Sequence, residues 1–400
     1  MWDAVHDIGR NPDTGGYNRF VWNDADQTMR EWFAGEAANR GLDLYVDRNG
    51  NQWAWWGDPA AGDALVLGSH LDSVPEGGAY DGPLGVLSSY AALDSLRTKG
   101  FRPDRPIAVV NFVDEEGSRF GISCAGSRLL TGGLDPERAR ALRDRDGRTM
   151  AEVLRRAGRE PGELGRDDEL LGRIGCFVEL HVEQGHDLVD RGHAVGLGSE
   201  IWPHGRFRFD FTGEANHAGT TRMEDRRDPM LTYAMTALAA NKRARLTGGE
   251  ARATFGRIEV EPGGTNAVPS RVQAWLDARA SEQSMLRELV ETVTRLATER
   301  AGRDDTSVTM VAESASPPVR FDRALASRLA GRLGGVPVIP TAAGHDAGVL
   351  SAAGIPTAML FVRNPTGISH SPEEFAERDD CLAGVAALAA CVEEFAGGAT

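Results

Sequence analysis

Five segments of the sequence bring together side chains that bind metals or move protons. They are residues 70–81, 114–118, 181–184, 344–347 and 367–372. The candidate metal ligands in these segments are His70, Asp81, Glu116, His181 and His370. A set of three imidazoles and two carboxylates suits zinc, manganese, cobalt or nickel. Two ions that share a bridging carboxylate would lie about 3.5–4 Å apart and would generate hydroxide near neutral pH. The residue types therefore favour metal-assisted hydrolysis.

Each segment alone has an ordinary structural explanation as a surface loop, a solvated turn or a structural histidine. The pair Glu115-Glu116, however, follows an apolar run, and adjacent carboxylates at the end of a buried strand repel unless a cation or a proton separates them. One carboxylate of such a pair can bind metal while its neighbour polarises a water. Asp72 is expected to accept the second ring N–H of His70. The recurrence of all five segments at predicted strand ends or in glycine-rich loops favours one shared site.

The apolar runs that precede these segments predict buried strands, at residues 64–68, 106–113 and 176–181. Residues 85–96, between the first two strands, have the spacing of a buried helix. Strand, helix and strand at this pitch predict parallel crossover units, which place functional residues where the strands end.

The pattern changes near residue 201. Phe207, Phe209 and Phe211 alternate with polar residues, which predicts a strand with one buried face. Further elements are expected in the βαββαβ order of a small open-faced α+β domain: a helix at 229–243, strands at 253–260 and 272–280, a helix at 281–301 and a strand at 307–311. After residue 316 we expect a helix (323–333), a strand (358–362) and a closing helix (380–395).

The predicted fold is therefore α/β, with a mixed, mostly parallel sheet flanked by helices in an aminopeptidase-like arrangement. Residues 1–201 and 315–400 are expected to form a catalytic domain that carries two metal ions. Residues 202–314 are expected to form an inserted α+β domain that acts as a lid and dimerisation domain.

Composition excludes some classes of protein. The chain has 400 residues, 41% of them hydrophobic, and a formal net charge of −15, which argues against a nucleic-acid partner because phosphate binding needs a basic face. We expect no signal peptide at the N-terminus and no membrane span, since no apolar run approaches about 18 residues. The four scattered cysteines suggest buried thiols. A cytoplasmic enzyme is expected.

Seven ordered motifs resemble those of the hydantoinase/carbamoylase family, whose members include N-carbamoyl-L-amino acid hydrolases, allantoate amidohydrolases and β-ureidopropionases. In chain order the motifs are Gly-Ser-His-Leu-Asp-Ser-Val-Pro, Tyr-Asp-Gly-Pro-Leu-Gly-Val, Asp-Glu-Glu-Gly-Ser-Arg-Phe, Glu-Leu-His-Val-Glu-Gln-Gly, Ala-Asn-His-Ala-Gly-Thr-Thr, Gly-Gly-Thr-Asn-Ala-Val-Pro and Gly-Ile-Ser-His-Ser-Pro-Glu-Glu. The resemblance covers about residues 60–375. It implies a homodimeric hydrolase with two divalent ions, Zn²⁺ or Mn²⁺, with Co²⁺ or Ni²⁺ as alternatives.

The resemblance also implies a role for each metal ligand. His70 and His181 would bind one ion and Glu116 and His370 the other, with Asp81 bridging. Glu115 would be the general base that deprotonates the bridging water and passes the proton to the leaving nitrogen. Asp72 is counted with it among the catalytic residues.

Other residues are implied to contact the substrate. His217 would reach across a dimer to stabilise the oxyanion that develops in the transition state. Asn266 and Arg279 would grip a substrate carboxylate, to which a guanidinium is geometrically matched, and Gln184 and His345 would make further contacts. An alternative for Arg279 is a salt bridge with Asp277, although residues two apart on a strand share a face only at a distance.

Several alternatives for the substrate stay open. An N-carbamoyl-L-amino acid and allantoate both present a carboxylate and a ureido carbonyl, so the sequence does not decide between them. We favour the N-carbamoyl-L-amino acid slightly. Hydrolysis of an N-acyl amino acid or a dipeptide at the same metal site is the second hypothesis, and a binding protein without turnover is the third. Three residues depart from the usual family pattern near the expected pocket and hinge, namely His186, His204 and Arg222, and they leave the substrate undecided.

Overall fold

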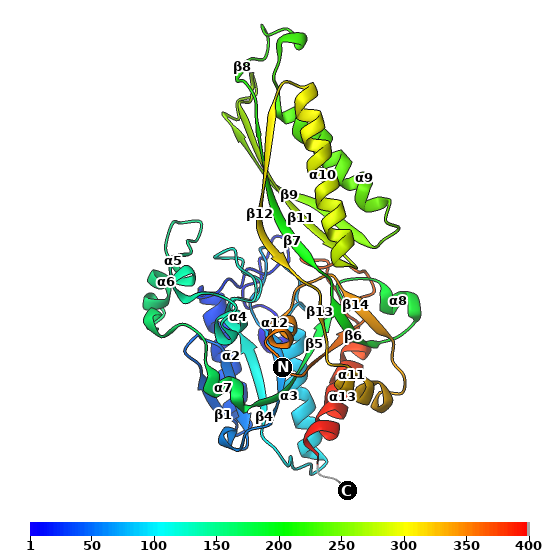
Figure 1. Ribbon diagram of the computed structural model, residues 1–400. Helices are drawn as coiled ribbons and strands as arrows, with labels where there is room; N and C mark the ends of the chain where they lie inside the picture. Colours follow the sequence, from blue (N-terminus) through cyan, green and yellow to red (C-terminus); the bar gives the residue numbers. More distant parts are fainter. Residues whose placement is uncertain (398–400) are drawn as a thin grey trace. The chain divides into compact units, whose positions relative to one another are not determined.

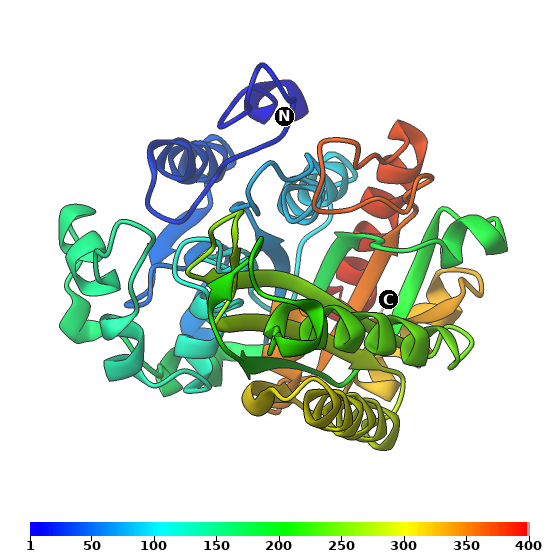
Figure 2. The same cartoon turned by 90° about the horizontal axis from the view of Figure 1, so that it is seen from above.

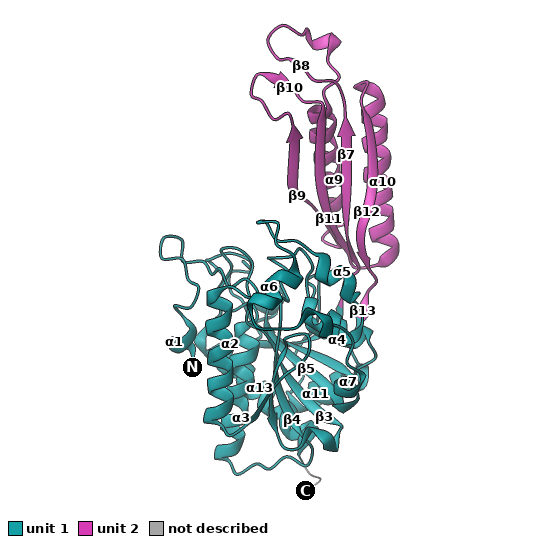
Figure 3. Cartoon of the chain, turned by 90° about the vertical axis from the view of Figure 1, so that its left-hand side faces the viewer, with its two compact units in different colours: residues 1–200, 320–400 teal, residues 201–319 magenta. Residues whose placement is uncertain are grey.

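A computed structural model describes residues 1–397 of the chain. The chain divides into two compact units, unit 1 with residues 1–200 and 320–400 and unit 2 with residues 201–319 (Figure 3). The sequence predicts the second boundary at 314/315, whereas the division falls at 319/320. The expected strand at 307–311 extends to Ser316, where it still pairs with His204 of its neighbour, and this continuation moves the boundary.

Unit 1 is built on a mixed sheet whose strand order is β1-β2-β4-β3-β5-β15-β6-β13, with β14 paired to β6 (Figure 1). The strands are β1 (Asp43–Val46), β2 (Gln52–Trp56), β3 (Ala64–His70), β4 (Ile107–Phe112), β5 (Ile174–Val182), β6 (Val195–Ile201), β13 (Val319–Arg320), β14 (Val338–Thr341) and β15 (Thr357–Val362). The central strands β4, β3, β5 and β15 are parallel. The prediction of a mostly parallel sheet is confirmed.

The central strands are apolar because both of their faces are covered. Every residue of β3, β4 and β15 is buried, as expected of parallel strands between two helical layers. Their register places His70 opposite Phe112 and His181 opposite Phe361. The histidines thus lie at the carboxyl ends of neighbouring strands.

Helices cover both faces of this sheet. They are α1 (Trp2–Val5), α2 (Asp24–Asn39), α3 (Pro83–Thr98), α4 (Ala125–Thr131), α5 (Pro136–Ala141), α6 (Met150–Arg156), α7 (Asp168–Arg173), α8 (Asp187–Arg191), α11 (Arg323–Arg332), α12 (Asp346–Ala352) and α13 (Arg378–Ala396), with short 3₁₀ turns at Pro59–Ala61 and Pro161–Glu163. Helices α2, α3 and α13 line one face (Figure 2), where Phe33, Tyr90 and Leu388 join the main hydrophobic core. Helices α4 and α12 pack together on the other face.

Unit 2 is a four-stranded antiparallel sheet with two helices on one face. Its elements are β7 (His204–Thr212), β8 (Asn216–His217), a 3₁₀ turn (Met223–Asp225), α9 (Pro229–Arg245), β9 (Ala251–Glu261), β10 (Ala267–Val268), β11 (Arg271–Ala280), α10 (Gln283–Arg303) and β12 (Ser307–Ser316). The strand order is β12-β7-β11-β9, and β8 pairs with β10 beyond it. The side chains of β11 alternate strictly between buried and half-buried, and the inner face packs on α9 and α10 through Phe209, Phe211 and Val293.

Within residues 1–397, no helix is both long and apolar enough to cross a membrane.

Candidate metal centre

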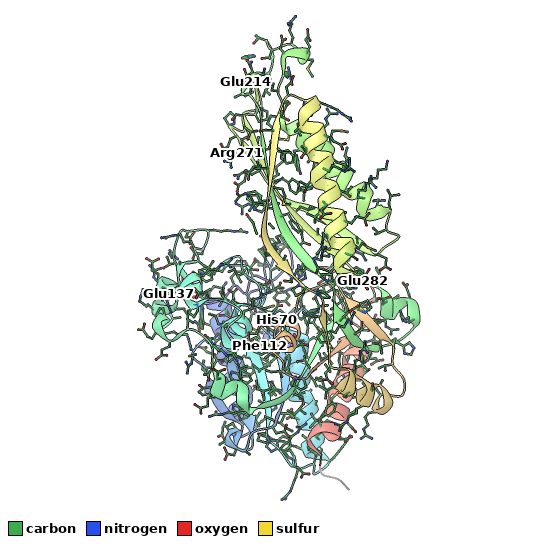
Figure 4. All side chains as sticks on the ribbon, in the orientation of Figure 1. His70, Phe112, Glu137, Glu214, Arg271 and Glu282 are labelled. Carbon is green, nitrogen blue, oxygen red and sulfur yellow. The ribbon has the colours of Figure 1, made fainter. Side chains whose placement is uncertain are left out.

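Five side chains from separate segments of unit 1 converge at the carboxyl end of the sheet. His70 ends β3 and His181 lies near the end of β5. Asp81 precedes α3, Glu116 follows β4, and His370 lies in the segment between β15 and α13. Their ligand atoms form two overlapping groups, His70–Asp81–His181 and Asp81–Glu116–His370, and within each group all atoms lie within 4.8 Å of one another. Figure 4 shows His70 inside unit 1, near Phe112 at the end of β4.

The Asp81 carboxylate is shared between the two groups, one oxygen to each. Oδ1 lies 3.1 Å from His181 Nε2 and 3.4 Å from His70 Nε2. Oδ2 lies 3.4 Å from His370 Nε2, which is 3.7 Å from Glu116 Oε2. Gly82 permits this approach, because a Cβ atom there would lie 2.4 Å from the His70 ring. A carboxylate that offers its two oxygens to two ligand groups has the arrangement of a bridging ligand.

The ring orientations of His70 and His181 leave their lone pairs facing this carboxylate. His70 Nδ1 donates to the carbonyl oxygen of Asp72 at 3.1 Å, and His181 Nδ1 donates to that of Val182 at 2.9 Å. The two Nε2 atoms are buried and have no hydrogen-bond partner. Imidazole lone pairs that face a buried carboxylate need a proton or a cation between them, so the site fits a metal ion.

The pKa shifts express the same requirement. Burial lowers the pKa of His70, but the nearby carboxylates of Asp72, Asp81 and Glu115 raise it well above its usual value. Burial raises the pKa of Asp81, but the charge of His181 and the closeness of the three imidazoles hold it well below its usual value. The cluster therefore stabilises positive charge beside Asp81, which a divalent cation also provides.

Asp72 supports the site in a different way from the one predicted. Its backbone carbonyl, rather than its carboxylate, is the nearer acceptor for His70, since Nδ1 lies 3.5 Å from Oδ1. The carboxylate instead accepts the backbone N–H groups of Glu115 and Glu116, each at 3.1 Å. Asp72 thus fixes the backbone of the acidic pair, which the spacing His-x-Asp did not reveal.

Glu115 lies beside the ligand groups without belonging to either. Its Oε2 is 3.9 Å from His70 Nε2, and its Oε1 accepts the thiol of Cys124 at 3.1 Å. Burial raises the pKa of Glu115 well above its usual value. Burial and then the charge of Asp81 raise the pKa of Glu116 to about 7. A buried carboxylate next to a cation site, but outside it, is placed to exchange protons.

The two further residues predicted in unit 1 also lie at the site. Gln184 Nε2 donates to Asp81 Oδ2 at 2.9 Å and to Ser369 Oγ at 3.1 Å. The His345 ring packs edge-on against His181, with centroids 4.5 Å apart, and burial lowers the pKa of His345 well below its usual value.

Sequence reasoning missed several buried supports. Glu179, fully buried and two residues before His181 on β5, accepts the Ser69 hydroxyl at 2.7 Å and the Ala347 N–H at 2.8 Å. Ser127 Oγ donates to the buried Asp346 at 2.5 Å. The signal was a charged residue inside an apolar strand for Glu179, whereas nothing in the local sequence marks the partner of Asp346.

The remaining predicted residues lie in unit 2, at opposite ends of its sheet. His217 and Asn266 are neighbours, because His217 pairs with Ala267 and the Ala218 N–H donates to the Asn266 carbonyl at 2.9 Å. Arg279 pairs with His204 at the other end of β11. Figure 4 marks these ends with Arg271, which begins β11, and Glu282, which follows it.

Arg279 forms the salt bridge with Asp277 that was the alternative to a substrate role. Nε lies 2.7 Å from Oδ1 and Nη2 lies 3.1 Å from Oδ2. The long arginine side chain spans the i to i+2 separation along the strand, so the expectation that this distance weakens the pair is wrong.

The three residues that depart from the family pattern lie outside the two ligand groups. The His186 ring lies against Gly367, where a Cβ atom would be 2.4 Å from its Nε2. His204 Nδ1 lies 3.1 Å from the Trp202 carbonyl oxygen. Arg222 is exposed and pairs with Asp225 at 2.7 Å.

Overlapping ligand groups around a shared aspartate, at the carboxyl ends of strands in a helix-flanked sheet, define a metal-dependent hydrolase. The chain belongs to peptidase family M20/M25/M40, which matches residues 66–394, and its enzymes use divalent metal ions. The resemblance to the hydantoinase/carbamoylase amidases is confirmed by the similarities that follow.

Similar proteins cover nearly the whole chain. An N-carbamoyl-L-amino acid amidohydrolase of Geobacillus stearothermophilus is 34% identical over 406 residues, which cover 100% of this chain and 98% of that protein. An allantoate amidohydrolase of Escherichia coli is 30% identical, with 97% and 95% covered. The crystal structure of a hydantoinase/carbamoylase family amidase from Burkholderia vietnamiensis superposes with a TM-score of 0.88 at 30% identity, with 99% and 96% covered.

Proposed function

We propose that this protein hydrolyses the ureido C–N bond of an N-carbamoyl-L-amino acid or an allantoate-like compound, with release of ammonia and carbon dioxide. The observation that carries the proposal is the Asp81 carboxylate shared between two ligand groups, with the buried Glu115 beside them. The names of similar proteins support a ureido substrate.

The proposed metal ligands follow the two groups. His70, His181 and Asp81 would hold one divalent ion, and Glu116, His370 and Asp81 the other. Mixed imidazole and carboxylate donors suit Zn²⁺ or Mn²⁺, and accept Co²⁺ or Ni²⁺. When bound, such ions polarise a carbonyl group and lower the pKa of water.

Glu115 is the proposed general base. It takes a proton from the attacking water, whose oxygen bonds to the ureido carbon, and gives that proton to the nitrogen that leaves as the C–N bond breaks. Asp72 and Cys124 hold its backbone and side chain. The carbamoyl fragment ends as ammonia and carbon dioxide.

His217 is the proposed donor to the oxyanion. Its Nδ1 accepts the backbone N–H groups of Gly219 and Thr220 at 2.9 and 3.1 Å. Because Nδ1 is an acceptor, the neutral ring carries its proton on Nε2. An exposed ring with a fixed Nε2–H is ready to donate to charge that develops in a transition state.

Arg279 is the proposed partner of the substrate carboxylate. Its side chain is 29% exposed, and Asp277 fixes the plane of the guanidinium through two contacts. A fixed guanidinium plane favours bidentate recognition of a carboxylate. Gln184 and His345 are proposed to contact the ureido end, because they lie against Asp81 and His181.

The positions of His217 and Arg279 support a homodimer. Arg271 pairs with Thr212 at one end of the sheet and Arg279 with His204 at the other, and eight residues of antiparallel strand span about 27 Å. One small substrate therefore cannot touch His217 and Arg279 of the same chain. We propose that His217 and Asn266 serve the site of a second copy.

Unit 2 offers two surfaces for this second copy. Strand β9 is an edge strand of the four-stranded sheet and is eleven residues long, and unpaired edges favour strand addition. On α9, the apolar side chains of Leu231, Met235 and Leu238 are 46%, 45% and 66% exposed. Their i, i+4, i+7 spacing places them in one stripe.

The alternative function is hydrolysis of an N-acyl amino acid or dipeptide at the same site, since the metal ligands and base suit any amide carbonyl. A panel assay separates the two. The protein is stripped, reloaded with Mn²⁺ and incubated with N-carbamoyl-L- and D-amino acids, allantoate, β-ureidopropionate and an N-acetyl amino acid. Metal-dependent ammonia from one ureido compound supports the proposal and identifies the substrate. Amine release from the N-acetyl compound alone would replace it with the acylase activity.

A further inference from the structure

Glu374 connects two segments that lie far apart in the sequence at the metal centre. It lies in the segment between β15 and α13 and is only 4% exposed. Its Oε1 accepts the backbone N–H groups of Tyr80 and Asp81, both at 2.9 Å. Its Oε2 accepts the Ser369 hydroxyl at 2.9 Å. The buried Glu374 carboxylate thus joins its own segment to residues more than 290 positions earlier in the sequence.

A glycine makes room for this carboxylate. A Cβ atom at Gly78 would lie 2.3 Å from Glu374 Oε1 and 2.4 Å from its Cδ. The backbone of Gly78 is not in the left-handed region, so another residue is excluded there by the closeness of Glu374 rather than by backbone strain.

The groups that Glu374 holds carry ligands of both proposed ions. Asp81 contributes to both ligand groups, and its backbone N–H is held directly. Ser369 precedes His370, and its hydroxyl also lies 3.2 Å from Asp81 Oδ2. Glu374 therefore ties the segment that carries His370 to the segment that carries Asp81.

We infer that Glu374 is a positioning residue, which holds the Asp81 and His370 segments in the arrangement that binds both ions. The inference rests on the proposed function for the identity of the metal ligands. Residues that orient ligands in this way typically contribute about 10–100-fold to metal affinity.

Glu374 acts as an acceptor of hydrogen bonds, and the chemistry predicts which substitutions are tolerated. A glutamine retains one oxygen for the Tyr80 and Asp81 N–H groups, since a carbonyl oxygen has two lone pairs. Its amide then donates to Ser369 Oγ, whose single proton turns to Asp81. Glu374→Gln should consequently bind metal almost as well as the wild type, whereas Glu374→Ala leaves two buried N–H groups without a partner.

The test measures Mn²⁺ affinity by competition with a chelator, so it does not depend on hydrolysis. We expect Glu374→Ala to lose about 10–100-fold in affinity and Glu374→Gln to stay within about threefold of the wild type. Glu373→Ala is the matched control, because Glu373 is adjacent and exposed and its carboxylate accepts the hydroxyl of nearby Ser371; it should bind like the wild type. Gly78→Ala displaces the Glu374 carboxylate but removes no polar group, and it should lose affinity even where Glu374→Ala fails to fold.

The outcomes separate this inference from the proposed function. Wild-type affinity in both Glu374→Ala and Gly78→Ala would overturn the inference, as would an equal loss in Glu373→Ala. Tight Mn²⁺ binding by a wild-type protein that cleaves no ureido compound would refute the proposed substrate and leave the role of Glu374 intact. A wild-type protein without Mn²⁺ affinity would refute the metal centre and the inference together.

Discussion

Replacing Glu115 by glutamine is the sharpest test of the proposed chemistry. Glutamine keeps the size and shape of the side chain, and the amide oxygen can still accept the Cys124 thiol. The backbone N–H of Glu115 stays bonded to Asp72. The substitution therefore removes the capacity to take up a proton while it leaves the two ligand groups in place.

The expected loss of kcat follows from the removal of this one proton acceptor. General bases contribute about 10²–10⁴-fold to rate, which is about 2.7–5.4 kcal/mol of transition-state stabilisation. We expect kcat to fall in this range with Mn²⁺ affinity unchanged, because Glu115 belongs to neither ligand group. Ammonia release under saturating substrate gives kcat, and chelator competition gives the affinity.

Glu116→Gln is the matched control for this prediction. Glu116 is the adjacent acid and lies in the Asp81–Glu116–His370 group, so its variant should lose metal affinity as well as rate. Near wild-type turnover in Glu115→Gln would refute the assignment of the base. Equal loss of Mn²⁺ from the two variants would show that the two carboxylates have been given the wrong roles.

Three further predictions concern the bridge, the carboxylate contact and the dimer. Asp81→Asn should hold about one ion or fewer per chain by elemental analysis, because an amide offers one oxygen in place of the bridge; a full metal complement would contradict bridging. Arg279→Lys should raise KM about 10–100-fold with little change in kcat, as loss of a charge-assisted bidentate contact requires; an unchanged KM would return Arg279 to a purely structural pair with Asp277. His217→Ala should lower kcat about 10²–10³-fold. Mixing it with Glu115→Gln chains and allowing subunit exchange should restore about a quarter of wild-type activity, since half the dimers gain one intact site; no recovery despite exchange would argue against a role across subunits.

Much of unit 1 could be predicted because its parallel strands are continuous apolar runs. A strand whose two faces are both covered is apolar along its whole length, so the apolar run marks where the strand begins and ends. Several of the predicted metal ligands and the predicted base lie at or directly after the ends of such runs. The run before Asp114 and the run that ends at His181 indicated the edge of the sheet where the ligands gather. The strands of unit 2 could be predicted equally well. Because β7 and β11 each bury one face, buried and more exposed side chains alternate along them.

Supports that connect distant segments were not predictable in this way. The partner of the Asp72 carboxylate is the backbone of Glu115 and Glu116, 43 and 44 residues away, and a triplet spacing pointed instead to His70. Glu374 meets Asp81 only because the segment after β15 returns to the same edge of the sheet. Local patterns record the burial and backbone form of a segment, and they contain no information on which other segment lies against it.

The sequence by itself determined the ligand types, the strand ends that carry them and the alternation of strands and helices, because each depends on the chemistry of neighbouring residues. The tertiary structure decided distances between segments. It showed that the two oxygens of Asp81 face different ligand groups, and that Asn266 lies beside His217 rather than Arg279. Asn266 and Arg279 are only thirteen residues apart in the sequence, yet they lie at opposite ends of the sheet. The ten-residue strand β11 carries the chain from one end to the other.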